Sequence, residues 1–386
     1  MIPPMVAWEA VNIKNKETQK SKSRIIEEHF NDVWTMMETK RIVTFHESIR
    51  WRFGVSASAV VLFYFVTIVA GLLLRDLARK WPKLMHYWYE KEKIFLKSPY
   101  RATKYNPTTL MTFVAITIFF IVIFEHTMYH IASYHETVLN MEYCNATNQS
   151  DVLKRLYLRE RGHFADVLPF SYWIVPILEW ENLTFAISWS YIDVIIVNIS
   201  IGLTTRFKQL NNRINNIQNL NLMEDQWLHL RKQHGALTDL VLEVNNHVSS
   251  LILLSCGNNL YFIVVYIFKS FTPSDSIYDD IHFYTVVFLI ILRTMITLYA
   301  TSTINDASKG ILNTLRKVPQ KSWNFEVQRF IDQIEAQTVA LTGKNMFKLT
   351  RKMILAFTGT VVTFEIALLD QIQSEPSNIG ACHATF

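Results

Sequence analysis

Six long apolar runs constrain this chain more than any other feature of its sequence. Each approaches the roughly 20 residues that a helix needs to cross a bilayer. Only 18% of all residues are charged, whereas soluble domains carry about 25%. We therefore predict an all-α protein, a polytopic membrane helical bundle with six apparent spans in the lipid bilayer. The predicted spans cover residues 55–75, 108–133, 182–204, 247–269, 281–301 and 353–370.

A shorter apolar stretch, VLPFSYWIVPILEW at residues 167–180, precedes the third predicted span. It is too short to cross a membrane and is interrupted by prolines, so we expect a re-entrant or interfacial segment. The start of the chain is charged and lacks an apolar core, so the sequence predicts no signal peptide.

The loop charges predict an orientation, because Lys and Arg accumulate on the cytoplasmic side of membrane proteins. Basic residues are frequent in the loops at 76–107, 205–246 and 302–352, and absent between the fourth and fifth runs and after Asp370. The loop at 134–166 carries NAT and NQS motifs, which make Asn145 and Asn148 glycosylation acceptors if that loop faces outward. The pattern alternates and predicts an extracellular C-terminus.

The N-terminal segment, residues 1–54, contradicts this alternation. It is rich in Lys and Arg, as a cytoplasmic segment would be, although six spans with an outer C-terminus place it outside. Either this segment stays outside against the charge rule, or the chain is a truncated or alternatively started form that lacks one span. The charge pattern favours the second interpretation.

Several motifs along the chain resemble insect gustatory receptors of the sugar-receptor subfamily. The resemblance covers about residues 55–372. It lies in LARKWPKLMHYW at 77–88, EHTMYH at 125–130, the stretch 188–214, SCGNNLYFI at 255–263, the stretches 292–308 and 327–352, and TFEIALLDQ at 363–371. That family has seven spans and a cytoplasmic N-terminus, so the absent span would be its first.

The resemblance implies a ligand-gated, non-selective cation channel in the plasma membrane of a gustatory neuron. The implied assembly is a homo- or hetero-tetramer with related gustatory receptors, and its ligand is a sugar. It further implies a bundle with an outward ligand pocket at 55–301, cytoplasmic anchor helices at 302–352, a pore-lining last span at 353–370 and an extracellular tail at 371–386. The alternative is a truncated isoform that does not conduct alone but assembles with full-length sugar receptors and modulates them.

The last span carries the candidate pore residues. The family motif there is Thr-Tyr, five mostly apolar residues and then Gln-Phe. Thr363 and Phe364 stand at its start, with Phe for Tyr, and Asp370 stands at its Gln position. Rings of acidic side chains select cations in pores, so four copies of Asp370 near the outer end would concentrate permeant cations. Alternatively, the span ends before Asp370, and its carboxylate is simply solvated. Glu365 lies about 140° around the helix from Asp370, so we expect it to pair within the bundle. The candidate pore-lining residues are Thr363, Phe364, Ala367, Asp370 and Gln371.

Polar side chains in the outer halves of the spans are candidates for a sugar site. A sugar requires buried hydrogen-bonding groups and an aromatic platform, and buried polar groups in a bilayer are costly unless they are used. The alternative is interhelical hydrogen bonding, which we favour for Asp193 because Arg293 could satisfy it. Trp173 and Trp180 could cover a pocket or serve as interfacial aromatics. The candidate ligand residues are Glu125, His126, Tyr129, Trp189, Asp193, Asn258, Asn259 and Tyr261.

Other function classes find little support in the sequence. It contains no Walker motif, zinc-ligand spacing or nucleophile elbow, so we predict no enzyme activity, no cofactor and no metal site. The net charge of +5 does not indicate nucleic acid, because the basic residues lie in particular loops. Apolar stripes in 211–246 and 324–341 indicate packing helices. Cys144 and Cys382 could pair only if both lie outside.

Overall fold

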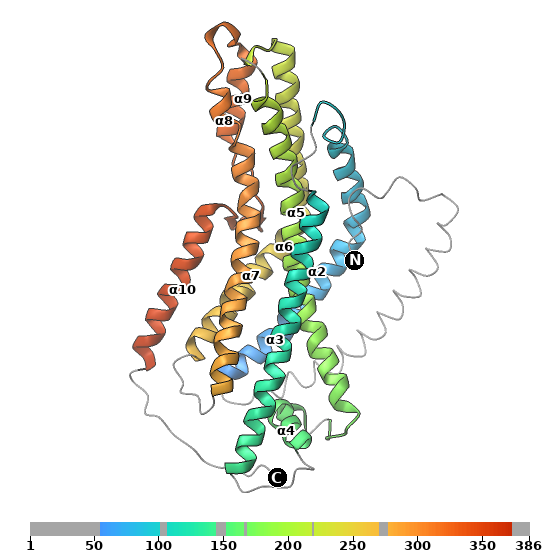
Figure 1. Cartoon of the computed structure of the whole chain (residues 1–386), viewed down its shortest axis with the longest axis vertical. Helices are drawn as coiled ribbons and strands as arrows, with labels where there is room; N and C mark the ends of the chain where they lie inside the picture. The colour runs from blue at the N-terminus through green and yellow to red at the C-terminus, as the bar shows by residue number, and fades with distance from the viewer. Residues whose placement is uncertain are drawn as a thin grey trace, which may run out of the picture. The chain divides into compact units, whose positions relative to one another are not determined.

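The computed structural model describes residues 55–100, 106–143, 152–165, 168–217, 220–269 and 277–372. The chain divides into two compact units, Met1–Tyr64 and Phe65–Phe386. The described part of the first unit is the beginning of helix α2, and all other described elements belong to the second (Figure 1). Asn145, Asn148, Cys144 and Cys382 lie outside the described residues.

The described chain is almost entirely helical, as the sequence predicted (Figure 1). Two-residue strands β1 and β2 form a small antiparallel hairpin that pairs Thr342 with Lys348 and Gly343 with Phe347. In order, the elements are α2 (Val55–Glu92), α3 (Pro107–Tyr143), α4 (Val152–Ala165), α5 (Ile174–Asn215), α6 (Glu224–Lys269), α7 (Ile277–Lys309), α8 (Leu312–Leu315), the 3₁₀ turn η4 (Gln320–Ser322), α9 (Phe325–Ala336), β1 (Thr342–Gly343), β2 (Phe347–Lys348) and α10 (Arg351–Ile372).

Within the described residues, 5 helices are long and apolar enough to cross a membrane, namely α2, α3, α5, α6 and α7. They contain the first five predicted spans, and α10 covers the sixth. The helices are longer than the predicted spans. Helix α6 has 46 residues, which corresponds to about 70 Å, whereas a bilayer core is about 30 Å thick. These helices therefore extend well beyond the membrane.

The stretch at 167–180 is not a separate re-entrant segment. Its second half is the beginning of α5, which continues without a break from Ile174 to Asn215. Pro176 lies in the first turn, where a helix loses no hydrogen bond to proline, so the predicted interruption does not occur. Trp173 and Trp180 are 82% and 72% exposed, as interfacial aromatic side chains would be.

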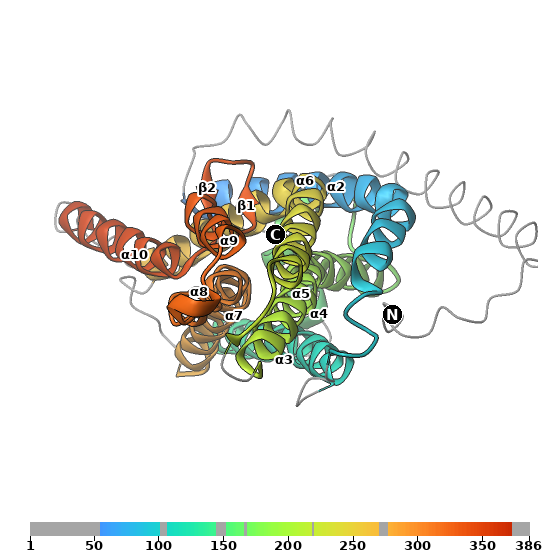
Figure 2. The ribbon, with the colours of Figure 1, turned by 90° about the horizontal axis from the view of Figure 1, so that it is seen from above.

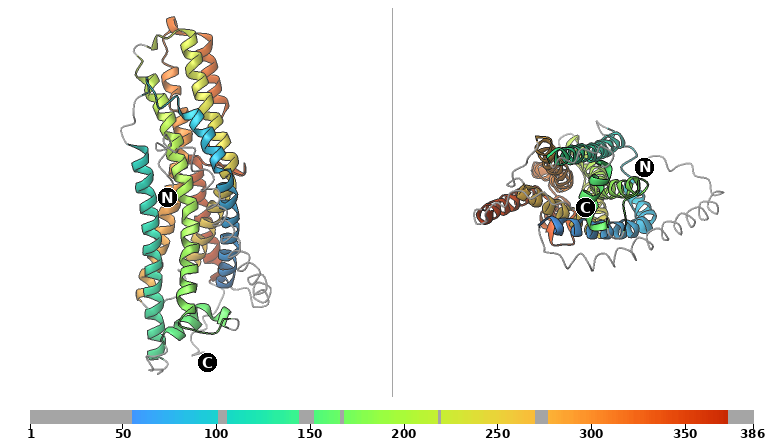
Figure 3. Two further views of the ribbon diagram at one scale, coloured as in Figure 1. Left: turned by 90° about the vertical axis from the view of Figure 1, so that its right-hand side faces the viewer. Right: turned by 90° about the horizontal axis from the view of Figure 1, so that it is seen from below.

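Helix α5 forms the centre of the second unit. It packs against α3, α6 and α7 (Figure 2), and one side of it is buried from Ile192 to Leu210. Gly202 permits a close approach here, because a Cβ atom at this position would lie 3.0 Å from the Trp88 ring. Helix α10 lies to the side and contacts α6 and α7 (Figures 2 and 3).

The apolar stripes predicted in the loops are buried. Leu237, Leu240 and Val244 on α6 and Phe330 on α9 are 0% exposed, and α6 packs against α9 and β1. The side chain of Asn324 caps α9 by accepting a hydrogen bond from the Val327 amide at 3.0 Å.

Polar contacts join the same elements. Arg231 Nε donates to Glu326 Oε2 at 2.8 Å, and this contact holds the pKa of Glu326 below its usual range. The Thr342 amide donates to Asn245 Oδ1 at 2.7 Å. The N-terminal half of α6 is therefore fixed to the segments that follow α7.

Candidate functional site

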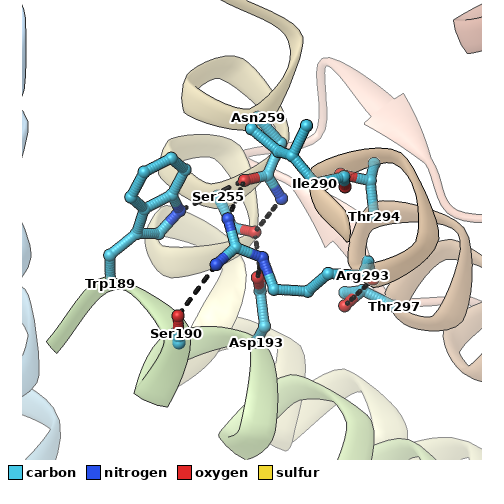
Figure 4. A network of polar contacts seen from close by, with 9 residues as sticks. All are labelled: Trp189, Ser190, Asp193, Ser255, Asn259, Ile290, Arg293, Thr294 and Thr297. Atoms are coloured by element: carbon cyan, nitrogen blue, oxygen red, sulfur yellow. Dashed lines mark hydrogen bonds and ion pairs between the residues drawn. The ribbon is translucent and has the colours of Figure 1, made fainter. Parts of the chain in front are cut away.

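A buried ion pair joins two membrane helices at the centre of the bundle. Asp193 of α5 faces Arg293 of α7, with Asp193 Oδ2 3.2 Å from Arg293 Nε (Figure 4). The two side chains are 0% and 4% exposed. The sequence analysis predicted that these two residues could satisfy each other, and the structure confirms it.

Three further residues satisfy the remaining polar atoms of this pair (Figure 4). Arg293 Nη1 donates to Ser190 Oγ at 2.8 Å, and Ser255 Oγ donates to Asp193 Oδ1 at 2.5 Å. Asn259 Oδ1 accepts from Arg293 Nη2 at 3.4 Å. Because Ser255 and Asn259 belong to α6, the network connects α5, α6 and α7.

Trp189 closes one side of this network. Its ring lies under the Arg293 guanidinium, 4.5 Å from ring centroid to Cζ, at a distance where cation–π attraction is favourable. Its Nε1 donates to Asn259 Oδ1 at 3.1 Å, and its ring contacts Phe262 at 5.1 Å. Trp189 is therefore held on several sides.

Asn258 and Tyr261 are neighbours of this network along α6. Asn258 is 5% exposed, and both polar atoms of its side chain lack a hydrogen-bond partner among the described residues. Such a buried amide is costly unless something else satisfies it. Tyr261 is half-buried, and the centroid of its ring lies 5.4 Å from that of Phe262.

A second polar cluster joins α3 to α4 and the first turns of α5. Tyr129 donates to Glu160 Oε2 at 2.5 Å, and Ser133 donates to the other oxygen of Glu160. The Nε2 atoms of His126 and His130 are 3.0 Å apart. Glu179 Oε2 lies 3.3 Å from His130 Nε2.

The predicted ligand residues therefore separate into two groups. Trp189, Asp193 and Asn259 belong to the central network, while His126 and Tyr129 belong to the second polar cluster. Glu125 is half-buried on α3, the helix that carries His126 and Tyr129. It also lies within electrostatic range of Arg293 of the central network.

The sequence analysis missed Ser190, Ser255, Glu160 and Glu179. The two serines lie three residues before Asp193 and four before Asn259, so helical spacing places them on the same faces. That spacing could have identified them. Glu160 and Glu179 lie in a region without a clear apolar period, so no signal in the sequence indicated their partners.

The sequence also predicted no metal site, yet one group of described residues could hold a metal ion. The ligand atoms of His126, His130 and Glu179 all lie within 4.8 Å of one another.

The candidate pore residues lie on α10. Thr363 and Phe364 are exposed, and the Thr363 hydroxyl donates back to the Gly359 carbonyl at 2.8 Å. Ala367, Asp370 and Gln371 are also within α10, but their side chains lie outside the described residues.

Comparison with known proteins identifies what this arrangement resembles. The family model of the trehalose receptors matches residues 19–382. The chain is 34% identical over 318 residues to the gustatory receptor for sugar taste 64b of Drosophila melanogaster, covering 82% of this chain and 78% of that one. It is 30% identical over 309 residues to the gustatory receptor for sugar taste 64f of the same organism, covering 80% and 65%.

The fold also resembles solved structures. The insect olfactory receptor OR5 from Machilis hrabei in complex with eugenol superimposes with a TM-score of 0.63. The match covers 94% of this chain and 93% of that chain at 13% sequence identity, so it concerns the fold alone.

The central ion pair generates a stability prediction. Replacing Arg293 with Gln leaves the Asp193 carboxylate buried without its cation, and breaking a buried pair in this way costs about 3–5 kcal/mol. We expect a clearly lower thermal unfolding midpoint of the detergent-purified protein and weaker surface labelling in cells.

Arg316→Gln is the matched control, because Arg316 pairs with Glu335 at the surface, where the two side chains are 56% and 46% exposed. Exposed pairs contribute about 0–1 kcal/mol. Equal effects of the two substitutions would show that the buried network does not stabilise the bundle.

Proposed function

This chain belongs to the trehalose receptor family, and we propose that it is a sugar receptor that works as a ligand-gated, non-selective cation channel. The family and the chemoreceptor channel fold make it a multi-pass protein of the plasma membrane. The proposed assembly is a tetramer, either of this chain alone or with related gustatory receptors, in a gustatory neuron. The proposed orientation has an extracellular C-terminus and glycans on Asn145 and Asn148.

The observation that carries the proposal is the Asn258 amide beside the central network, which has no hydrogen-bond partner among the described residues. A sugar is a neutral polyol, so its hydroxyl groups can donate to the carbonyl oxygen of Asn258 and accept from its amide nitrogen. Trp189 and Tyr261 supply aromatic surface for the apolar face of a sugar ring. The proposed ligand site comprises Glu125, His126, Tyr129, Trp189, Asp193, Asn258, Asn259 and Tyr261.

The surface of α10 supports the proposed pore. Several of its apolar side chains are strongly exposed within one chain, with Leu355 75% and Ile366 64% accessible. Exposed apolar surface on a helix that packs mainly against α6 and α7 among the described helices suits burial against lipid and against other subunits. The proposed pore face carries Thr363, Phe364, Ala367, Asp370 and Gln371.

Whole-cell current from cells that express this chain tests the function directly. We expect cation currents evoked by one or more members of a panel of mono- and disaccharides, from this chain alone or when a related sugar receptor is co-expressed. Surface labelling serves as the control for expression. Well-labelled cells that give no sugar-evoked current in either arrangement contradict the proposal.

Asn258→Ala tests the ligand site. One hydrogen bond contributes about 0.5–1.5 kcal/mol, so we expect the half-maximal concentration of the most effective sugar to rise roughly 3- to 10-fold. Asn212→Ala is the matched control, because Asn212 is exposed at the far end of α5. An unchanged dose response in the Asn258 variant, at equal surface labelling, removes Asn258 from the site.

Asp370→Asn tests the pore mouth. Removing four carboxylates from the entrance lowers the local cation concentration. We therefore expect single-channel conductance at low ionic strength to fall by roughly a factor of two or more. Glu375→Gln, which removes a carboxylate from the tail, provides the comparison. Conductance and selectivity that do not change show that Asp370 is only solvated.

A further inference from the structure

We propose that His126, His130 and Glu179 form a binding site for a divalent transition-metal ion, of which Zn²⁺ fits best, between α3 and α5. Two imidazoles and a carboxylate are ligands that zinc commonly takes in proteins. The site shares only His126 with the proposed sugar site and no residue with the proposed pore, and its test requires no channel activity.

The spacing of the three side chains matches such a site. A zinc ion with ligand atoms about 2.0–2.2 Å away holds them roughly 3.4 Å from one another in tetrahedral geometry. The observed separations are 3.0 Å between the Nε2 atoms of His126 and His130 and 3.3 Å between His130 Nε2 and Glu179 Oε2. The remaining separation is at most 4.8 Å, so small side-chain rotations suffice.

The helices present these ligands without distortion. His126 and His130 are four residues apart on α3, so they share one face of the helix. Their rings meet edge to face, with centroids 4.4 Å apart and an angle of 88°. Glu179 lies in the second turn of α5, so the site would join two helices that are distant in sequence.

The hydrogen-bonding capacity of the cluster also favours an ion. His130 Nε2 faces both His126 Nε2 and Glu179 Oε2, but in a neutral imidazole this nitrogen carries at most one proton. The buried Glu179 Oε2 has no hydrogen-bond partner among the described residues. Three lone-pair donors therefore converge where few protons are available, and a metal ion satisfies all three together.

The surrounding charges orient the carboxylate. Arg161 Nη2 lies 3.7 Å from Glu179 Oε1, which leaves Oε2 directed to His130. The Arg161 cation opposes a second cation nearby, but the Glu160 carboxylate lies in the same cluster, held by Tyr129. Arg161 therefore acts as an outer-shell partner that fixes the ligand, as such partners do in metal sites.

The cluster lies partly at the surface of the chain, near the C-terminal end of the predicted span 108–133. The His130 and Glu179 side chains are 36% and 30% exposed. Three protein ligands leave a fourth position for water. A bound ion would hold the beginning of α5 against α3 and would stabilise the folded protein according to its concentration.

The experiment measures zinc binding to the purified full chain, made without a histidine tag, by titration against a fluorescent zinc chelator. We expect one saturable zinc ion per wild-type chain, with a higher thermal unfolding midpoint when zinc is present. We expect His130→Ala and Glu179→Gln to weaken binding more than the roughly 10- to 100-fold loss caused by removing an outer-shell partner.

His247→Gln is the matched control, because His247 Nε2 also lies 3.3 Å from a carboxylate, that of Glu243. The metal-ligand cluster identified among the described residues does not include that pair. Binding that His247→Gln weakens as much as His130→Ala would indicate nonspecific zinc association and overturn the proposal.

A wild-type chain that binds no saturable zinc overturns it regardless of any variant. If His130→Ala has a lower unfolding midpoint without zinc, its weaker zinc binding could reflect misfolding. The near-isosteric Glu179→Gln then tests whether the cluster binds zinc. Unaltered zinc affinity in that variant also refutes the site.

Discussion

The ion pair between Asp193 and Arg293 is the interaction on which the arrangement of the membrane helices depends. Charges in a bundle are costly unless they are paired and their other polar atoms are hydrogen-bonded. Ser190, Ser255 and Asn259 meet that requirement only if α5, α6 and α7 keep their rotation and their relative depth (Figure 4). Apolar packing alone would allow several registers of the helices, because lipid is as apolar as the helix surfaces. The polar network therefore fixes a register that hydrophobic contacts would leave variable.

Helix α6 connects this network to the segments that precede α10. Helix α6 holds Ser255 and Asn259 in its C-terminal half, and in its N-terminal half Asn245 bonds the β1 strand while Arg231 bonds α9. His234 lies between the rings of Phe207 and Phe330. One continuous helix thus contacts both the central network and the segment that leads into α10. A change in the rotation of α6 would alter both regions, which gives a ligand site on α6 a direct mechanical connection to the proposed pore helix.

The sequence predicted those features that follow from local pattern. Apolar length identified the spans, and the isolated charges at Asp193 and Arg293 predicted their pairing, because few partners exist within apolar helices. Pattern did not reveal that residues 174–180 begin α5, because Pro176 usually signals a break and is harmless only in a first turn. It also missed Glu160 and Glu179, since their partners are set by how α4 and the first turns of α5 pack against α3, and no periodicity encodes those contacts. Among the described residues, side chains paired outside the predicted apolar spans were thus the least predictable.

The contacts that the second polar cluster already makes bear on where a sugar would bind. His126 and Tyr129 are candidate sugar ligands, but Tyr129 already bonds Glu160, and His126 already faces His130. A ligand that used them would have to break existing contacts, and the net gain from exchanging one hydrogen bond for another is small. In the part of the chain that the structure describes, Asn258 makes no such contact, so each bond it makes to a hydroxyl group removes a desolvation cost that the protein already carries. The chemistry therefore favours a polyol near Asn258 and an ion between His126, His130 and Glu179.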